Sequence, residues 1–240
     1  MRLNKVSAIS FDLDDTLWSF PATVERAEAT LHAWLIQHAP GTASVLPTSM
    51  ALAELRNDFE RLRPDLVGDF RALRLGSINQ ALELAKEDPN LTELAYEVFY
   101  AARQKVEFFE DVMPALQWLS ARFPLAAVTN GNADLRLTGG SEFFRGTLSA
   151  SSVGFAKPDV EIFHAAARLV DVPPVEMLHV GDDYDLDVVG ALDAGLQAAW
   201  LIRRPHDGGP PSASSTHRPH LTIDNLLLLC EALGGPRLSH

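Results

Sequence analysis

The sequence has a single cysteine, no long apolar stretch and no excess of basic residues. Cys230 lies in an apolar, helix-like run, so no disulfide can form within one chain and we expect a buried core thiol. No apolar stretch approaches the ~18 residues that a membrane-spanning helix needs, and the first residues offer no signal-peptide apolar region. We therefore expect a cytoplasmic protein that does not bind membranes.

Acidic side chains outnumber basic ones throughout the chain. The 20 Lys and Arg residues face 32 Asp and Glu residues, which gives a net charge of −12 at pH 7. Such a charge argues against nucleic acid as a partner, because phosphate backbones would be repelled. The nucleotide loops G-x-x-x-x-G-K-[ST] and G-x-G-x-x-G are also missing. If the substrate is an anion, a cation and a few well-placed basic groups must attract it locally.

Short apolar segments that alternate with helical patterns predict an α/β fold. Such alternation is typical of a doubly wound parallel sheet with helices on both faces. The rich Pro, Gly and Ser content of residues 203–219 predicts a long mobile loop. Strands are expected at 6–11, 125–128, 177–180, 198–202 and 220–223, and helices at 113–122, 159–170, 188–194 and 224–233.

A helical insert separates the first expected strand from the others. Apolar residues recur at helical spacing from about residue 20 to about residue 105, which predicts four helices with no strand between them. We therefore expect an α/β domain of residues 1–17 and 111–240 and an all-helical domain of residues 18–110. The helical domain would lie over the carboxyl ends of the strands, where open α/β folds bind ligands.

Three carboxylates follow the first strand within four residues. Asp12 and Asp14 are two residues apart, and in an extended chain this spacing puts both side chains on the same side. Like charges this close repel each other unless a cation lies between them, and a hard divalent cation suits carboxylate oxygens. Alternatively, Asp14, Asp15 and Thr16 cap a following helix.

Polar residues also follow the second strand and precede a later helix. Thr129, Asn130 and Gly131 offer a hydroxyl, an amide and exposed backbone N–H groups, which could form an anion cradle or a plain turn. Lys157 precedes Pro158, which we place in the first turn of a helix and which holds the lysine on a stiff segment. A lone lysine is usually solvated, so Lys157 is a candidate site residue only in combination with the other polar clusters.

A second acidic cluster follows the strand at 177–180, with four aspartates between residues 182 and 187. Stabilisation of a helix N-terminus explains one or two of them. A calcium-binding EF-hand loop is excluded, because counting from Asp183 the sixth and twelfth positions are Val188 and Ala194 rather than Gly and Glu. We expect Asp182 to meet Asp12 and Asp14 at a metal ion.

This ordered set resembles the haloacid dehalogenase superfamily of phosphatases, with its four motifs at 12–16, 129, 157 and 181–187. The resemblance covers the whole chain: it implies a Rossmann-like core, and the helical insert is similar to the C1 cap of the superfamily. The motifs at 11–17, 128–132 and 179–183 are also similar to those of YigB-type bacterial phosphatases. Those enzymes are associated with flavin mononucleotide (FMN) and 5-amino-6-(5-phospho-ribitylamino)uracil of riboflavin biosynthesis.

The resemblance implies a role for each motif residue. Asp12 would attack phosphorus and form an aspartyl-phosphate, and Asp14 would protonate the leaving alcohol and later deprotonate water. Thr129 and Lys157 would hold the phosphoryl oxygens. Asn130 and Gly131 would bind phosphate beside Thr129.

The resemblance also implies a Mg²⁺ cofactor. Its ligands would be Asp12, the main-chain carbonyl of Asp14, and Asp182. Asp183 and Asp187 would support the site from behind, with Asp187 orienting water or the lysine. Haloacid dehalogenases proper have no carboxylate at the position of Asp14 and need no metal, so dehalogenase activity is not expected.

Substrate choice is assigned to the helical insert. Arg71 and Arg74 are three residues apart and share one helix face, so we expect one of them to contact the leaving group; alternatively both are solvated surface charges. The expected function is Mg²⁺-dependent hydrolysis of a small phosphorylated metabolite by a monomer or weak homodimer. The alternatives are a phosphatase for sugar phosphates or nucleotides, a phosphomutase, and a non-catalytic binding protein.

Overall fold

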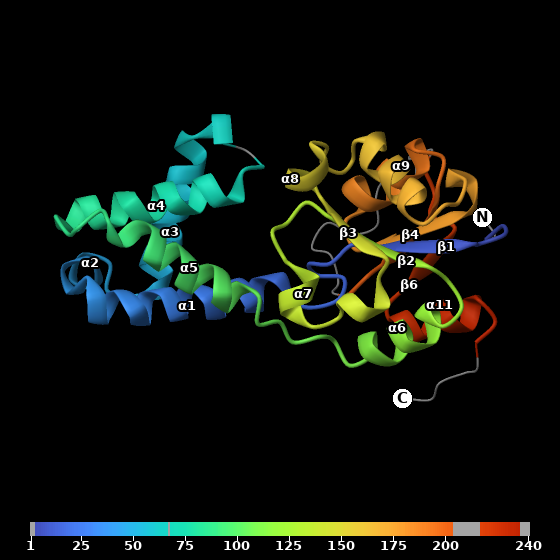
Figure 1. The fold of residues 1–240 in the computed structure, drawn as a ribbon, viewed down its shortest axis with the longest axis horizontal. Coiled ribbons are helices and arrows are strands. Elements are labelled where there is room, and N and C mark those ends of the chain that lie inside the picture. The colour runs from blue at the N-terminus through green and yellow to red at the C-terminus, as the bar shows by residue number, and fades with distance from the viewer. Residues whose placement is uncertain (1–2, 67, 204–216, 236–240) are drawn as a thin grey trace. The chain divides into compact units, whose positions relative to one another are not determined.

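The computed structural model describes residues 3–66, 68–203 and 217–235, and the chain forms two compact units (Figure 1). The first unit comprises Met1–Ser19 and Glu107–His240, and the second is Phe20–Val106. Most of the loop predicted at 203–219 lies outside the described residues. Within the described part of the chain, no helix is long and apolar enough to cross a membrane.

The first unit is built on a parallel sheet whose strand order, among the described residues, is β3-β2-β1-β4-β5-β6. The central strand β1 pairs with β2 on one side and β4 on the other, with Ile9 opposite Leu125 and Leu178. All residues of β1, β2, β4 and β5 are buried, as expected for a parallel sheet covered on both faces. The strands are β1 (Ala8–Phe11), β2 (Leu125–Thr129), β3 (Gly146–Ser149), β4 (Met177–Gly181), β5 (Gln197–Leu201) and β6 (Leu221–Ile223).

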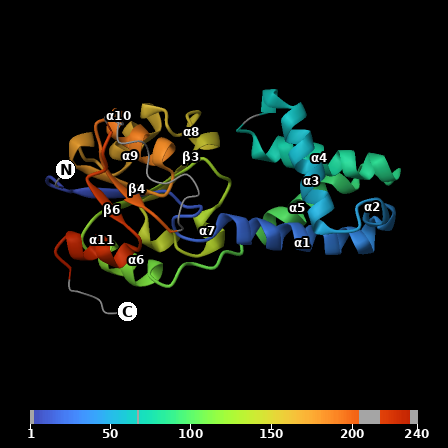
Figure 2. The same cartoon turned by 180° about the vertical axis from the view of Figure 1, so that it is seen from behind.

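Helices cover the two faces of this sheet, which confirms the predicted α/β fold. Helices α9 (Val160–Leu169) and α10 (Gly190–Asp193) lie on one face, and α6 (Val112–Ser120) and α11 (Leu226–Ala232) lie on the other, as two opposite views show (Figures 1 and 2). Cys230 is a buried free thiol in α11, as expected. The shorter elements are α7 (Leu135–Thr138), η2 (Ser141–Phe143), α8 (Ala150–Val153), η3 (Pro174–Glu176) and η4 (Tyr184–Val189).

Two local expectations for the first unit were wrong. The helix expected at 188–194 starts earlier, as a π-helical turn from Tyr184 that continues into α10. Pro158 does not lie in the first turn of α9, because Asp159 caps that helix by accepting a hydrogen bond from the backbone N–H of Glu161 at 2.9 Å. Lys157 is therefore presented by the loop before the helix.

The second unit is all-helical and has a core of its own. Its buried cluster includes Leu31, Ile78, Leu82 and Phe99, which come from three different helices. Asp69 caps the N-terminus of α4 by accepting a hydrogen bond from the backbone N–H of Ala72 at 2.9 Å. Its elements are α1 (Phe20–His38), α2 (Pro40–Val45), α3 (Ser49–Leu62), η1 (Pro64–Leu66), α4 (Phe70–Ala85) and α5 (Leu91–Arg103).

The chain leaves the first unit and returns to it at neighbouring points. The backbone N–H of Phe109 donates to the carbonyl oxygen of Leu17 at 3.0 Å. Trp18 and Phe108 form an antiparallel bridge, and their rings meet edge to face with centroids 5.4 Å apart. The two connecting segments therefore run side by side within the first unit.

Arg203, two residues after the end of β5, binds the chain next to both connecting segments. Its guanidinium donates to the carbonyl oxygen of Thr16 at 2.9 and 3.1 Å and forms a bidentate ion pair with Asp111 at 2.7 and 2.8 Å. It also lies over the ring of Phe109, 4.5 Å from the centroid. A paired, largely buried guanidinium of this kind fixes geometry through several directed bonds at once.

Candidate active site

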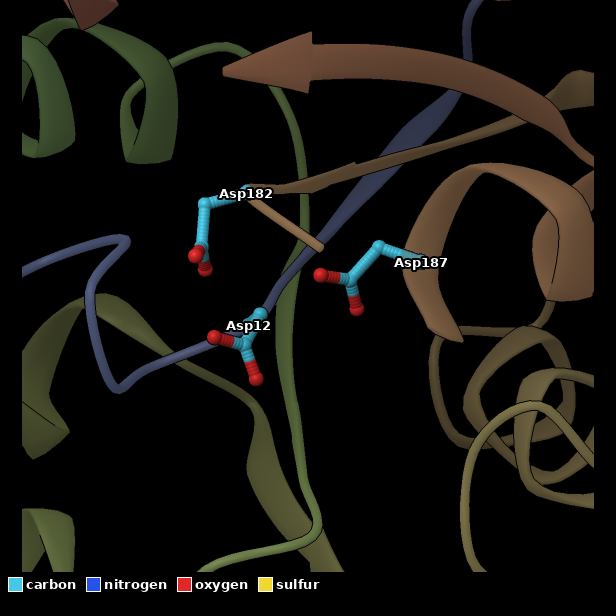
Figure 3. A group of neighbouring side chains, drawn as sticks. All are labelled: Asp12, Asp182 and Asp187. Atoms are coloured by element: carbon cyan, nitrogen blue, oxygen red, sulfur yellow. The ribbon is translucent and has the colours of Figure 1, made fainter. Parts of the chain in front are cut away.

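Three aspartates converge at the carboxyl edge of the sheet (Figure 3). Asp12 directly follows β1, Asp182 directly follows β4, and Asp187 belongs to the π-helical turn η4. One carboxylate oxygen from each lies within 4.8 Å of the other two. The neighbouring positions of β1 and β4 explain why residues 170 positions apart meet, because parallel strands end at the same edge.

Lys157 places its ammonium between two of these carboxylates. Its Nζ donates to Oδ1 of Asp12 at 2.5 Å and to Oδ1 of Asp187 at 2.6 Å, and the residue is only 4% exposed. Burial opposes the charge of Lys157, but the two adjacent carboxylates outweigh it and raise the pKa of the lysine above its usual value. The ammonium therefore keeps its proton and neutralises part of the acidic cluster.

The side chain of Asn130 holds the backbone of Lys157. Its Oδ1 accepts from the N–H of Lys157 at 2.7 Å, and its Nδ2 donates to the carbonyl oxygen of Lys157 at 2.9 Å. We expected Asn130 to bind phosphate, but the structure shows its amide paired with this backbone. The residue therefore positions the lysine.

Asp187 receives hydrogen bonds on both oxygens. Besides Lys157, the ring Nε2 of His179 lies 3.0 Å from Oδ1, and the backbone N–H of Asp183 donates to Oδ2 at 3.0 Å. Burial opposes ionisation of Asp187, yet the lysine charge and the histidine hydrogen bond lower its pKa below the usual range. The carboxylate is thus ionised and its orientation is fixed.

Asp12 and Asp182 are less well compensated. Burial raises the pKa of Asp12 well above its usual value; Lys157 works against this, while the charges of Asp187 and Asp182 add to it. Burial, reinforced by the charges of Asp187 and Asp15, raises the pKa of Asp182 to about 7. Crowded, partly uncompensated carboxylate oxygens fit a hard divalent cation, and Asp12 and Asp182 are its best-placed ligands because the oxygens of Asp187 already accept three hydrogen bonds.

Asp182 is held by two neighbours. The hydroxyl of Thr16 donates to Oδ1 of Asp182 at 3.1 Å, and the indole N–H of Trp200 donates to its main-chain carbonyl at 2.8 Å. Asp183 caps η4 by accepting from the backbone N–H groups of Asp185 and Leu186, both at 2.9 Å. The capping interpretation therefore applies to Asp183, while Asp182 and Asp187 face the site.

Asp14 lies against the Thr129–Gly131 turn. Its Oδ1 accepts from the indole N–H of Trp18 at 2.7 Å, and a methyl group added at Gly131 would come within 2.6 Å of its Oδ2. The backbone N–H of Gly131 donates to the hydroxyl of Thr129 at 2.9 Å. The turn is therefore internally bonded, and it needs glycine at this close approach.

Ser10 and His179 were missed by the sequence analysis. Each is a fully buried polar residue inside an otherwise apolar strand, and this pattern was the available signal. Ser10 Oγ lies 2.8 Å from Nδ1 of His179. The two residues connect the middle of the sheet to Asp187.

Arg71 and Arg74 lie on α4 of the helical unit, and the structure separates their roles. Arg74 is buried, pairs with Glu28 at 2.6 Å and stacks on the ring of Phe99, so neither the solvated alternative nor an accessible substrate contact fits it. Arg71 is exposed and pairs with Glu93 at 2.8 Å. Of the two, only Arg71 offers an accessible cation.

Known proteins are similar to this chain in sequence and in structure. Residues 6–195 match the family model of haloacid dehalogenase-like hydrolases. The chain is 33% identical over 232 residues to the 5-amino-6-(5-phospho-D-ribitylamino)uracil phosphatase YigB of Escherichia coli (strain K12), covering 95% of this chain and 96% of that protein. It is 28% identical to the glyceraldehyde 3-phosphate phosphatase of Methanopyrus kandleri, covering 86% of this chain and 88% of that protein.

A solved structure resembles the whole chain closely. The 2-haloacid dehalogenase from Pseudomonas syringae pv. Tomato DC3000 aligns with a TM-score of 0.80 at 34% identity, covering 95% of this chain and 98% of that one. The description of the family model and the names of these relatives all denote hydrolases. These names include both phosphatases and a dehalogenase, so the choice between a phosphate ester and a halogenated acid as substrate depends on the residues of the site.

Proposed function

Since the chain belongs to the haloacid dehalogenase-like hydrolase family, we propose that it hydrolyses a small phosphate monoester through an aspartyl-phosphate on Asp12. The observation that carries the proposal is the buried ammonium of Lys157 on Oδ1 of Asp12. It favours the ionised, nucleophilic form of a carboxylate that burial would otherwise protonate. Oδ2 of Asp12 is then the oxygen that attacks phosphorus.

Asp14 supplies the proton that such a displacement needs. As the bond from phosphorus to the ester oxygen breaks, the leaving alkoxide takes the proton of the Asp14 carboxyl group. In the second step water attacks the phosphorus of the aspartyl-phosphate, gives its proton to Asp14 and releases Asp12 as a carboxylate. The hydrogen bond from Trp18 and the contact with Gly131 hold Asp14 in place for both steps.

A bound divalent cation fits the acidic cluster, and we assign Mg²⁺ to it. Asp12, Asp182 and the main-chain carbonyl of Asp14 are the residues that would hold the ion. When bound, it would neutralise negative charge on the transferring phosphoryl group. Lys157 and the hydroxyl of Thr129 contribute the remaining donors for the phosphoryl oxygens.

We propose that the substrate belongs to the riboflavin pathway, either FMN or 5-amino-6-(5-phospho-ribitylamino)uracil. The relative from Escherichia coli supports this choice, since the alignment spans 95% of the chain. Dehalogenation is disfavoured because a halide leaves without taking up a proton, so Asp14 would have no role as a general acid. A sugar phosphate or nucleotide substrate would use the same chemistry.

The test measures phosphate release from a panel of esters that includes both flavin-pathway compounds, with Mg²⁺ and with chelator. Asp12→Asn should abolish release, and the matched control Asp185→Asn, an exposed carboxylate in η4, should leave it intact. Preference for the flavin-pathway esters supports the pathway, and preference for other esters rejects it while the chemistry stands. Halide release from 2-chloropropionate without phosphate release from any ester would overturn the phosphatase.

A further inference from the structure

A line of hydrogen bonds runs through the sheet beneath the acidic cluster. Ser10 on β1 and His179 on β4 are register partners, and both are fully buried. Ser10 Oγ lies 2.8 Å from Nδ1 of the imidazole, and Nε2 lies 3.0 Å from Oδ1 of Asp187. Asp187 in turn binds Lys157, whose ammonium binds Asp12. The chain of contacts therefore starts on β1 at Ser10 and ends at Asp12, the residue directly after β1.

The direction of each hydrogen bond follows from the donors available. Asp187 accepts from the lysine ammonium and is ionised, so it can only accept from the ring. Nε2 of His179 must then carry the proton, which leaves Nδ1 as the acceptor for the hydroxyl of Ser10. Burial lowers the pKa of His179, so the ring is the neutral imidazole in this one tautomer.

The imidazole of His179 and the hydroxyl of Ser10 lie in apolar surroundings, where burying polar groups costs free energy of folding unless they are hydrogen-bonded. The edge of the Phe163 ring meets the imidazole with centroids 5.0 Å apart, and Met177 and Val188 belong to the cluster on the same face of the sheet. A leucine at position 179 would suit these apolar neighbours, but it would leave the buried hydroxyl of Ser10 without the imidazole. What the imidazole adds is a directed donor to Oδ1 of Asp187.

We propose that His179 is a positioning residue: it fixes the carboxylate of Asp187 and thereby the ammonium of Lys157 against Asp12, while Ser10 selects its tautomer. This rests on the proposed function, since Asp12 is taken as the nucleophile. The lysine has two acceptors, and only a fixed Asp187 sets its position between them. A shift of the ammonium by a fraction of an ångström changes both the state of Asp12 and the contact with a phosphoryl oxygen.

The experiment compares three variants in steady-state hydrolysis of p-nitrophenyl phosphate and in urea unfolding. His179→Leu should lower kcat by about tenfold or more, as loss of a supporting partner does, with KM little changed. His179→Gln keeps an N–H donor at the position of Nε2 and should recover most of kcat. Met177→Ala, two residues earlier on the same face, should lower stability without lowering kcat.

A wild-type kcat in His179→Leu would overturn the proposal, and so would a loss of kcat in Met177→Ala as large as that in His179→Leu.

A second measurement does not depend on turnover. Long-range proton–nitrogen NMR, with the His179 signals among the eight histidines assigned from the His179→Gln spectrum, should show a neutral ring protonated at Nε2. A ring protonated only at Nδ1 would refute the positioning role of His179 even if the enzyme hydrolyses esters. A wild-type protein that releases no phosphate while showing the Nε2 tautomer would refute the proposed function instead.

Discussion

Replacing Lys157 with methionine removes the ammonium from between two buried carboxylates. Its Nζ lies 2.5 Å from Asp12 and 2.6 Å from Asp187, and the residue is 4% exposed. Methionine keeps an unbranched side chain that adapts to its surroundings, so the main loss is the positive charge. The variant measures what this cation contributes to folding when no divalent metal is present.

The size of the effect follows from the burial of the pair. Removing one partner of a buried pair typically costs about 3–5 kcal/mol, because the remaining charge stays buried without compensation. The exposed pair Lys5–Glu176, whose lysine side chain is 75% exposed, is the matched control. For such a pair about 0–1 kcal/mol is usual. We expect the free energy of unfolding to fall by about 3–5 kcal/mol in Lys157→Met and by less than about 1 kcal/mol in Lys5→Met at pH 7.5.

The deficit of Lys157→Met should shrink at lower pH. Burial raises the pKa of Asp12, and Lys157 is the group that restrains this rise. Without the lysine, the pKa of Asp12 in the folded protein lies even further above its value in the unfolded chain. The folded state therefore loses stability as the pH rises between the unfolded and folded pKa values, and regains it as the pH falls.

Urea unfolding in EDTA at pH 7.5 and pH 5, followed by tryptophan fluorescence, tests both statements. Mg²⁺ should restore part of the stability at pH 7.5, because a ligand that binds the folded state stabilises it and here supplies the missing positive charge. Equal losses in Lys157→Met and Lys5→Met would refute the argument from buried charge. A deficit that is the same at both pH values would refute the assignment to Asp12.

Three further predictions concern the metal, the turn and the connecting segments. Because burial raises the pKa of Asp182 to about 7, the Mg²⁺ affinity measured by calorimetry should fall about tenfold per pH unit below pH 7, and equal affinities at pH 6 and pH 8 would contradict this. Gly131→Ala would place a methyl group 2.6 Å from Oδ2 of Asp14, so kcat should fall by about tenfold to a hundredfold while the urea midpoint barely moves. Arg203→Met breaks the bidentate pair with Asp111 and should cost about 3–5 kcal/mol in urea unfolding, and strictly additive losses with Asp111→Asn would show that the pair is not coupled.

The sequence allowed the central site to be predicted because a parallel sheet gathers the ends of its strands. An apolar strand followed by acids marks Asp12 and Asp182, and the topology then brings them together without further information. The edge strand β3 was missed because its four residues, Gly146–Ser149, are only partly buried and carry no apolar run. Strand propensity depends on such context, which the local sequence does not contain.

Side-chain contacts between neighbouring strands could not be predicted from the sequence for a related reason. The contact of Ser10 with His179 depends on the register between β1 and β4, and it joins residues 169 positions apart. Arg74 illustrates the same limit in the helical unit. Helical spacing places it beside Arg71, but its burial depends on Glu28, a residue 46 positions away on α1.

The neighbouring exit and return points of the chain have an evolutionary consequence. Because Leu17 is hydrogen-bonded to Phe109, the segment between them only has to bring its own two ends together to be accommodated. The partners of β1 in the sheet, β2 and β4, both lie outside that segment. One contiguous stretch of gene could therefore be exchanged for another, with the strand-end carboxylates and Lys157 inherited unchanged. Such an attachment lets new selectivity arise by recombination rather than by gradual redesign of the reaction centre.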